Sequence, residues 1–209
     1  MAAAAQAGGI DTCGIWGRLG GTTRRRKMAN RAYLFADDLK EHGSVYRPDY
    51  VNRVKYYDSR HNLPVCWMFL FSRDDIRSFP VEFQGSSWLE WKLVAEKAKA
   101  VQRFRDRMDA VKKWANRPFD LMAELDSFVE TIAGWEGGQL ILDPDEIFGG
   151  WGIEDDNQRD HLRAIFEFLE TASPASLQEN PGCLGICYFS PDPTDFNRYC
   201  LDFMGATYG

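Results

Sequence analysis

The sequence of 209 residues lacks long apolar runs and the familiar catalytic signatures. No stretch approaches the roughly 18 consecutive apolar residues that a membrane-spanning helix needs, so we expect no integral membrane protein. There is no Walker loop, no G-x-G-x-x-G after a predicted strand, no G-x-S-x-G and no H-E-x-x-H. With 44% hydrophobic and 27% charged residues, the composition excludes a disordered chain, a collagen-like repeat and a coiled coil.

Cysteines are few, and they do not form the two close pairs of a zinc site. The five are Cys13, Cys66, Cys183, Cys187 and Cys200. Their odd number, without a secretory leader, predicts reduced thiols and a cytoplasmic location. Cys183 and Cys187 form one C-x3-C pair inside an apolar run, which favours small buried side chains of a strand. We therefore expect no metal and no cofactor.

The charge is distributed unevenly along the chain. The formal charge is −6, but residues 1–27 carry five cations against one acid, which leaves −10 for residues 28–209. An acidic body argues against binding to nucleic-acid phosphates and suits a basic protein partner. Residues 1–27 have no apolar periodicity and are interpreted as a disordered leader or a mis-assigned start before Met28. Residues 28–209 are expected to form a single domain.

The hydrophobic pattern of residues 28–209 predicts an α+β fold with a mainly antiparallel sheet flanked by three main helices. The expected strands are Arg31–Phe35, Val65–Phe71, Gln139–Leu142 and Leu184–Phe189, with an edge strand over Asn197–Met204. The expected helices are Ser87–Ala115, Phe119–Ile132 and a third that begins at Asp155 or Asp156 and ends at Thr171.

The first of these helices is predicted to be long and amphipathic. Ser87 and Glu90 have the spacing of a capping box, and apolar residues recur every three or four positions. Pro118 ends this helix, so the second helix is expected to run antiparallel to it. Residues 90–117 hold nine bases and four acids. This basic segment either binds an anionic partner or pairs with the acids of its own domain, and the second interpretation is favoured.

Acidic residues gather on either side of a glycine-rich loop, Phe148–Gly152. Asp143, Asp145 and Glu146 follow a predicted strand, and Glu154, Asp155 and Asp156 precede a predicted helix. Such acids either bind a divalent cation or cap the helix; calcium-loop spacing is absent, so capping is favoured. The loop lacks the Lys-Ser/Thr of a phosphate loop. His161, on the third helix, is interpreted as a partly buried structural residue.

Aromatic residues flank these acids, and a mixture of aromatic and charged side chains is typical of binding hot spots. The predicted binding face comprises Trp135, Asp145, Glu146, Phe148, Trp151, Asp155 and Asp156, with the aromatic residues exposed. No catalytic residue is predicted.

Two segments resemble a family of uncharacterised bacterial proteins: Met28-Ala-Asn-Arg-Ala-Tyr-Leu34, and Phe71-Ser-Arg-Asp-Asp-Ile76 ahead of a Trp-bearing helix. The resemblance implies a bacterial origin and a start at Met28, and it names no chemistry. By analogy of class, the first hypothesis is a non-enzymatic binding protein, an immunity-type inhibitor of a basic toxin or another protein partner. The alternative is a small-molecule-binding or hydrolytic enzyme with the acids around a cleft. Convergence of His161 with two acids in a deep pocket favours the enzyme, and a flat acidic face favours the binding protein.

Overall fold

The computed structural model describes residues 31–38, 55–60, 63–83, 85–115, 121–150, 152, 155–171, 186–187 and 203–208. The predictions for residues 1–27, for the hinge at residues 116–118 and for Trp151 lie outside these ranges.

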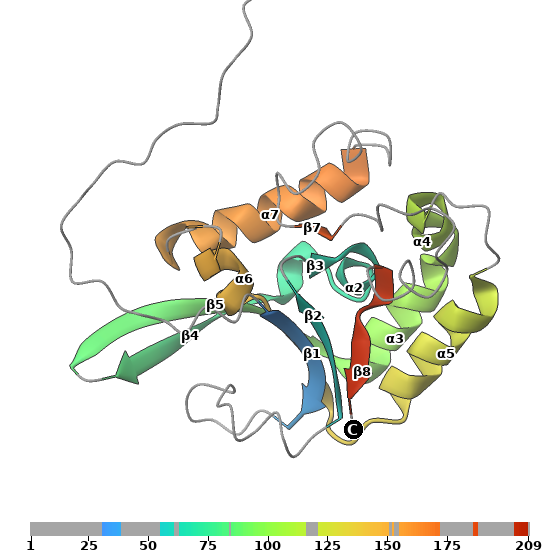
Figure 1. Cartoon of the computed structure of the whole chain (residues 1–209), viewed down its shortest axis with the longest axis horizontal. Helices are drawn as coiled ribbons and strands as arrows, with labels where there is room; N and C mark the ends of the chain where they lie inside the picture. Colours follow the sequence, from blue (N-terminus) through green and yellow to red (C-terminus); the bar gives the residue numbers. More distant parts are fainter. Residues whose placement is uncertain are drawn as a thin grey trace, which may run out of the picture.

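A six-stranded sheet is the centre of the fold, and its order is β4-β5-β6-β1-β2-β8 (Figure 1). Its strands are β1 (Arg31–Asp37), β2 (Tyr56–Arg60), β4 (Ile76–Phe83), β5 (Ser86–Glu96), β6 (Gln139–Asp143) and β8 (Ala206–Tyr208). Every neighbouring pair in this sheet is antiparallel. Two short strands, β3 (Leu63–Pro64) and β7 (Ile186–Cys187), form a separate parallel pair. The predicted α+β class with a mainly antiparallel sheet is confirmed.

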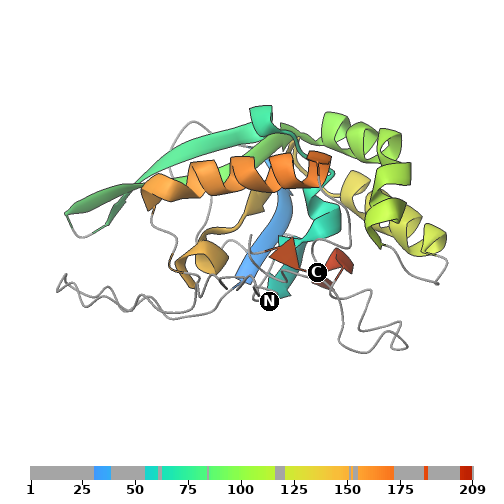
Figure 2. The ribbon, with the colours of Figure 1, turned by 90° about the horizontal axis from the view of Figure 1, so that it is seen from above.

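The helices supply the main hydrophobic core on one face of the sheet (Figure 2). They are α2 (Val65–Met68), α3 (Lys97–Asp106), α4 (Met108–Ala115), α5 (Met122–Ala133), α6 (Asp145–Gly150) and α7 (Asp155–Thr171), with a 3-10 turn η1 (Arg73–Asp75). The bounds of α5 and α7 agree closely with the predicted second and third helices. None of the helices in the described ranges combines the length and apolar character needed to cross a membrane.

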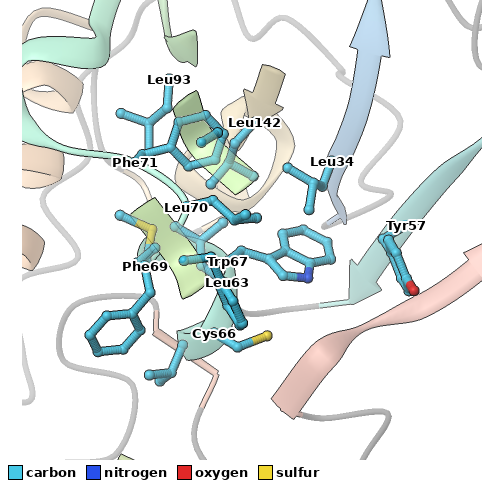
Figure 3. Close-up of a cluster of buried hydrophobic side chains, with 14 of the residues drawn as sticks. Leu34, Tyr57, Leu63, Cys66, Trp67, Phe69, Leu70, Phe71, Leu93 and Leu142 are labelled. Carbon is cyan, nitrogen blue, oxygen red and sulfur yellow. The ribbon is translucent and has the colours of Figure 1, made fainter. Parts of the chain in front are cut away.

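Side chains that alternate along each strand divide the sheet into two faces. On the first face, Leu34, Leu93 and Leu142 pack with the helices, and Trp67 of α2 lies at the centre of this cluster (Figure 3). The second face carries a smaller cluster of strand residues, Tyr33, Phe35, Val94 and Ile141. Both faces of β1 are therefore buried, which explains its nearly continuous apolar sequence.

The prediction of one helix over Ser87–Ala115 is wrong in its first third. Residues 86–96 form β5, and the helix begins at Lys97 and continues, with a break at Arg107, as α3 and α4. Ser87 is therefore no helix cap. The apolar spacing that resembled a helix arose because β5 buries side chains on both faces: Leu93 on the first and Val94 on the second.

Three further predictions need correction. Val65–Phe71 begins as the short helix α2, because periodicity cannot separate a buried strand from a buried helix in so short an apolar run. Part of the expected loop Phe148–Gly152 is helical, since α6 continues to Gly150. Of the strand expected over residues 184–189, the described residues, Ile186 and Cys187, form the strand β7 as predicted. The edge strand β8 begins at Ala206, two residues beyond the expected end.

Candidate functional site

A buried ion pair joins two central strands on the second face of the sheet. The register Leu93↔Leu142 places Lys92 of β5 beside Asp143 of β6. The Lys92 Nζ lies 2.5 Å from Asp143 Oδ2 and 3.2 Å from Glu90 Oε2. The side chains of Lys92 and Asp143 are 0% and 3% exposed. Such a desolvated charge persists only when it is paired and hydrogen-bonded.

The carboxylates around Lys92 favour its charged form. Burial alone lowers the pKa of Lys92, but the carboxylates of Asp143 and Glu90 outweigh it and raise the pKa above its ordinary value. The ammonium therefore stays protonated near neutral pH. The pKa of Glu90 is also raised, first by burial; Lys92 opposes this change, and Asp145 and Asp143 add to it.

The acidic segments converge on this pair from α6 and α7. Asp143 Oδ1 accepts a hydrogen bond from the backbone N–H of Asp145, at 3.1 Å. Gln158 of α7, fully buried, donates from Nε2 to Asp145 Oδ1 at 3.3 Å. Glu146 accepts a bond from the backbone N–H of Arg31. We name Glu90, Asp143, Asp145 and Glu146 the acidic cluster.

The structure places the other predicted acids at the same end of α7. Asp155 and Asp156 are its first two residues, one turn before Gln158, which contacts Asp145. The starts of α6 and α7 therefore lie next to each other.

The prediction that Trp135 and Phe148 are exposed is wrong. Trp135 is 5% exposed and stacks on Tyr57, with ring centroids 5.5 Å apart. Phe148 is 0% exposed and meets His161 edge-on at 5.2 Å. Both rings belong to the main core, where their large apolar surface stabilises the fold. Neither ring can contact a partner on this surface unless it leaves the core.

Exposed apolar surface lies instead on a hairpin that the sequence reasoning missed. Because β6 pairs with β5 from Leu93 to Glu96, the residues 86–92 extend beyond β6 and pair with β4. Figures 1 and 2 show this part projecting from the rest of the sheet. We name residues 77–83 paired with residues 86–92 the arm. The signal for it was the recurrence of apolar residues at every second position on either side of Gly85: Phe79, Val81 and Phe83 before it, and Leu89, Trp91 and Leu93 after it.

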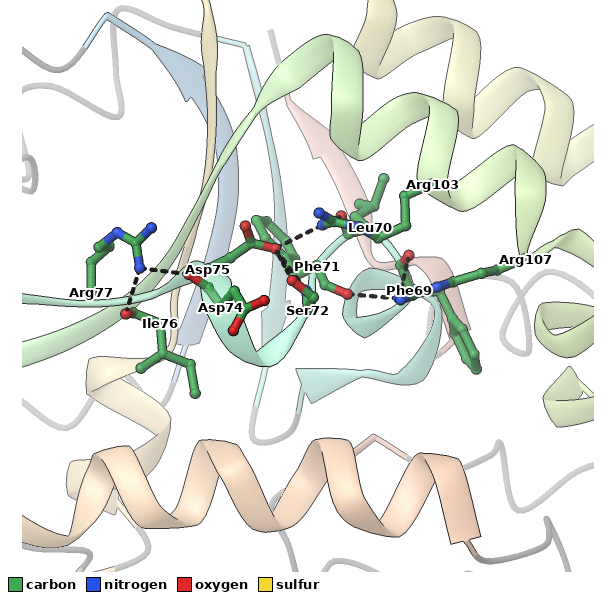
Figure 4. Close-up of polar contacts among 10 residues, drawn as sticks. All are labelled: Phe69, Leu70, Phe71, Ser72, Asp74, Asp75, Ile76, Arg77, Arg103 and Arg107. Carbon is green, nitrogen blue, oxygen red and sulfur yellow. Dashed lines mark hydrogen bonds and ion pairs between the residues drawn. The ribbon is translucent and has the colours of Figure 1, made fainter.

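Most of the described cations in the basic segment, residues 90–117, form hydrogen bonds or ion pairs with other groups of the protein. Arg103 Nη1 donates to Leu70 O and to Asp75 Oδ2, at 2.9 and 2.7 Å, and Arg107 Nη1 donates to Phe71 O at 2.7 Å (Figure 4). Arg105 pairs with Glu130, and Lys92 is fully buried. These contacts support the interpretation that the segment pairs with its own domain.

The part of the chain that the structure describes contains no candidate metal centre. Among the described residues, no three His, Cys, Asp or Glu side chains are grouped to hold a metal ion. His161 packs on Phe148, and Cys66 donates from Sγ to Phe203 O at 2.7 Å. Comparison of the chain with protein-family models, curated proteins and solved structures found no match.

Proposed function

We propose that this chain is a non-enzymatic binding protein of a bacterial cytoplasm that docks a basic protein partner on the acidic cluster and the starts of α6 and α7. An immunity-type inhibitor of a basic toxin is the specific form of this proposal. The observation that carries it is the contact of Gln158 with Asp145, because it brings two acidic segments of the chain to one place beside Glu90.

The charge of this place favours a cationic partner. Four carboxylates gather here around the buried Lys92 ammonium. Lys92 is fully buried and paired with Asp143 and Glu90, so its ammonium does not itself contact a partner. Asp145 and Glu146 are half-buried and keep contact with solvent. Like-signed charge at a surface steers association with partners of opposite charge.

The experiment neutralises this surface without altering the core. A variant with Asp145→Asn, Glu146→Gln, Asp155→Asn and Asp156→Asn is compared with the wild type for association with a partner enriched from the source bacterium. We expect the association rate at low salt to fall by about tenfold or more, and to depend less on salt.

The matched control removes the same charge elsewhere. Its four substitutions are Asp109→Asn, Asp126→Asn, Glu136→Gln and Glu167→Gln, all at exposed positions. The control should associate at nearly the wild-type rate. If both variants slow association equally, the effect is one of net charge and the acidic docking surface is refuted.

A further inference from the structure

The arm carries a row of apolar side chains on the same face as the acidic cluster. Val81 lies opposite Trp88, and Phe79 lies opposite Glu90, so these four side chains share the second face of the sheet. Phe79, Val81 and Trp88 are each half-buried. We name these three residues the apolar strip.

The strip is continuous with the acidic cluster. Trp88 Nε1 donates to Glu90 Oε1 at 3.3 Å, and Glu90 contacts the buried Lys92. Phe79 packs against the buried cluster that contains Val94 and Ile141. An aromatic group on this hairpin, next to carboxylates, combines the apolar anchor and the polar rim that protein interfaces use.

We propose that the apolar strip is the anchoring half of the docking surface, and that it takes a basic protein segment in which apolar side chains alternate with Lys or Arg. This inference rests on the proposed function. The apolar side chains of the segment cover Trp88 and Val81, while its cations lie against the acidic cluster around Glu90. The apolar strip lowers the dissociation rate of the complex, and the acidic cluster raises its association rate.

The outer edge of β4 is less suited to this role than the face. β4 is the last strand of the sheet, and its backbone groups on that side could receive an added strand. Pro80 lies in the middle of β4, however, and has no N–H to donate. Proline on an edge strand is one of the devices that prevent such pairing.

The opposite face of the arm is also less suited. Leu89 is 43% exposed and is the one exposed large hydrophobic residue among those that the structure describes. It lies opposite Pro80 on the first face, on which Trp91 lies under Arg159 of α7. A single exposed leucine is common at protein surfaces and needs no partner.

A second copy of the chain is a poorer occupant than a basic partner. The chain has a formal charge of −6, and self-association through this face brings two acidic clusters together. Juxtaposed like charges oppose association, whereas a cationic segment removes the repulsion. The negative charge of this face therefore favours the basic partner over a second copy.

Two dye-labelled short peptides test the inference, one of alternating lysine and leucine and one of alternating lysine and glycine. Fluorescence anisotropy should show that the wild type binds the lysine–leucine peptide about tenfold more tightly, the gain expected from one buried apolar side chain. Trp88→Ala should abolish this difference by weakening binding of the lysine–leucine peptide. Val81→Ser provides a second variant of the strip if Trp88→Ala fails to fold.

Leu89→Ala is the matched control, since it removes a neighbouring apolar side chain from the opposite face of the arm. It should keep the preference for the lysine–leucine peptide. Equal binding of the two peptides by the wild type, or equal losses in Trp88→Ala and Leu89→Ala, overturns the inference. A wild-type dimer in sedimentation that Trp88→Ala dissociates also overturns it and assigns the strip to a second copy.

The proposed function and the role of the apolar strip can be refuted independently of each other. If the variant with neutral residues at positions 145, 146, 155 and 156 binds the lysine–glycine peptide as well as the wild type does, the acidic surface is refuted whatever the strip does. If that binding falls but the strip variants change nothing, the acidic surface remains and the anchoring role is lost.

Discussion

Lys92 and Asp143 are cross-strand neighbours whose opposite charges are both removed from solvent. The pair lies where the sheet narrows, because β6 ends at Asp143 while β5 continues into the arm. Asp143 also accepts a hydrogen bond from the backbone N–H of Asp145 at the start of α6. The same carboxylate thus connects the sheet, the arm and the acidic cluster.

Separating this pair should destabilise the fold strongly. We expect Lys92→Met to lower the free energy of unfolding by about 3–5 kcal/mol, because it leaves buried carboxylates without their cation. The double variant Lys92→Met/Asp143→Leu should recover much of this loss, since apolar side chains can replace a buried pair. Urea denaturation measures each value.

Lys99→Ala is the control for this prediction. Lys99 pairs with Glu96 at an exposed position, with side chains 73% and 49% exposed, so its loss should change the free energy of unfolding little. If Lys92→Met is no more harmful than Lys99→Ala, Lys92 is not buried in the folded protein.

Glu90 should make stability depend on pH in a defined direction. Its pKa is raised above the ordinary value of 4.5 by burial and by Asp145 and Asp143. The folded state therefore binds this proton more tightly than the unfolded state, and the contribution of Glu90 to the free energy of unfolding falls as pH rises from about 4.5 through the raised pKa. Glu90→Gln removes this contribution.

The measurement is the difference in free energy of unfolding between Glu90→Gln and the wild type at several pH values. This difference should increase with pH across that window, by at most about 1.4 kcal/mol per pH unit, and become constant above it. Parallel curves for the two proteins contradict the raised pKa.

Helices and strands are predicted correctly from the sequence where their apolar residues follow one periodicity and lie on one buried face. In α7, Leu162, Ile165 and Phe166 recur at helical spacing and are all buried, so both its type and its end were predicted. β5 fails this condition because it is buried on both faces near its C-terminal end and borders directly on a helix. The apolar residues of β5 were therefore assigned to the helical pattern that continues in α3.

For the site, the sequence identified the acids but not their aromatic neighbours. Asp145 and Glu146 were recognised as a cluster, and only tertiary structure shows that Glu90 and Lys92 join them. Trp135 and Phe148 are near the acids in sequence, but their rings are buried on the first face. Nearness in sequence does not determine which face of a sheet a side chain occupies, whereas alternation does once the strand is known.

Arg107 should contribute more to the free energy of unfolding than an exposed arginine in a surface ion pair does. Its contact is with the segment that directly follows α2. Its guanidinium donates to Phe71 O, and a charged donor to a part-buried carbonyl is worth about 1.5–3 kcal/mol. Arg107→Met should lose about this much in urea denaturation. Arg73→Ala removes a pair with Glu170 in which both side chains are well exposed, and it should lose at most about 1 kcal/mol. Equal losses contradict the role of Arg107.

Gly205 should tolerate no side chain, because it is confined both by its conformation and by its neighbours. Its φ is +79°, and an added Cβ would lie 2.4 Å from Cζ2 of Trp67 and 2.9 Å from Asp58 O. Trp67 cannot retreat easily, because it is fully buried and its Nε1 donates to Met204 O at 2.7 Å. Gly205→Ala should therefore lower the free energy of unfolding by about 2–5 kcal/mol through backbone strain and overpacking.

Gly85 is the matched control, because it separates these two causes. Its φ is +78°, nearly that of Gly205, but nothing lies within 4 Å of an added Cβ. Gly85→Ala should therefore show the backbone cost alone, about 1–2 kcal/mol. Urea denaturation of the two variants measures the excess at Gly205, which reports how firmly the segment before β8 is held against Trp67. If the two losses are equal, that contact does not constrain the C-terminal strand.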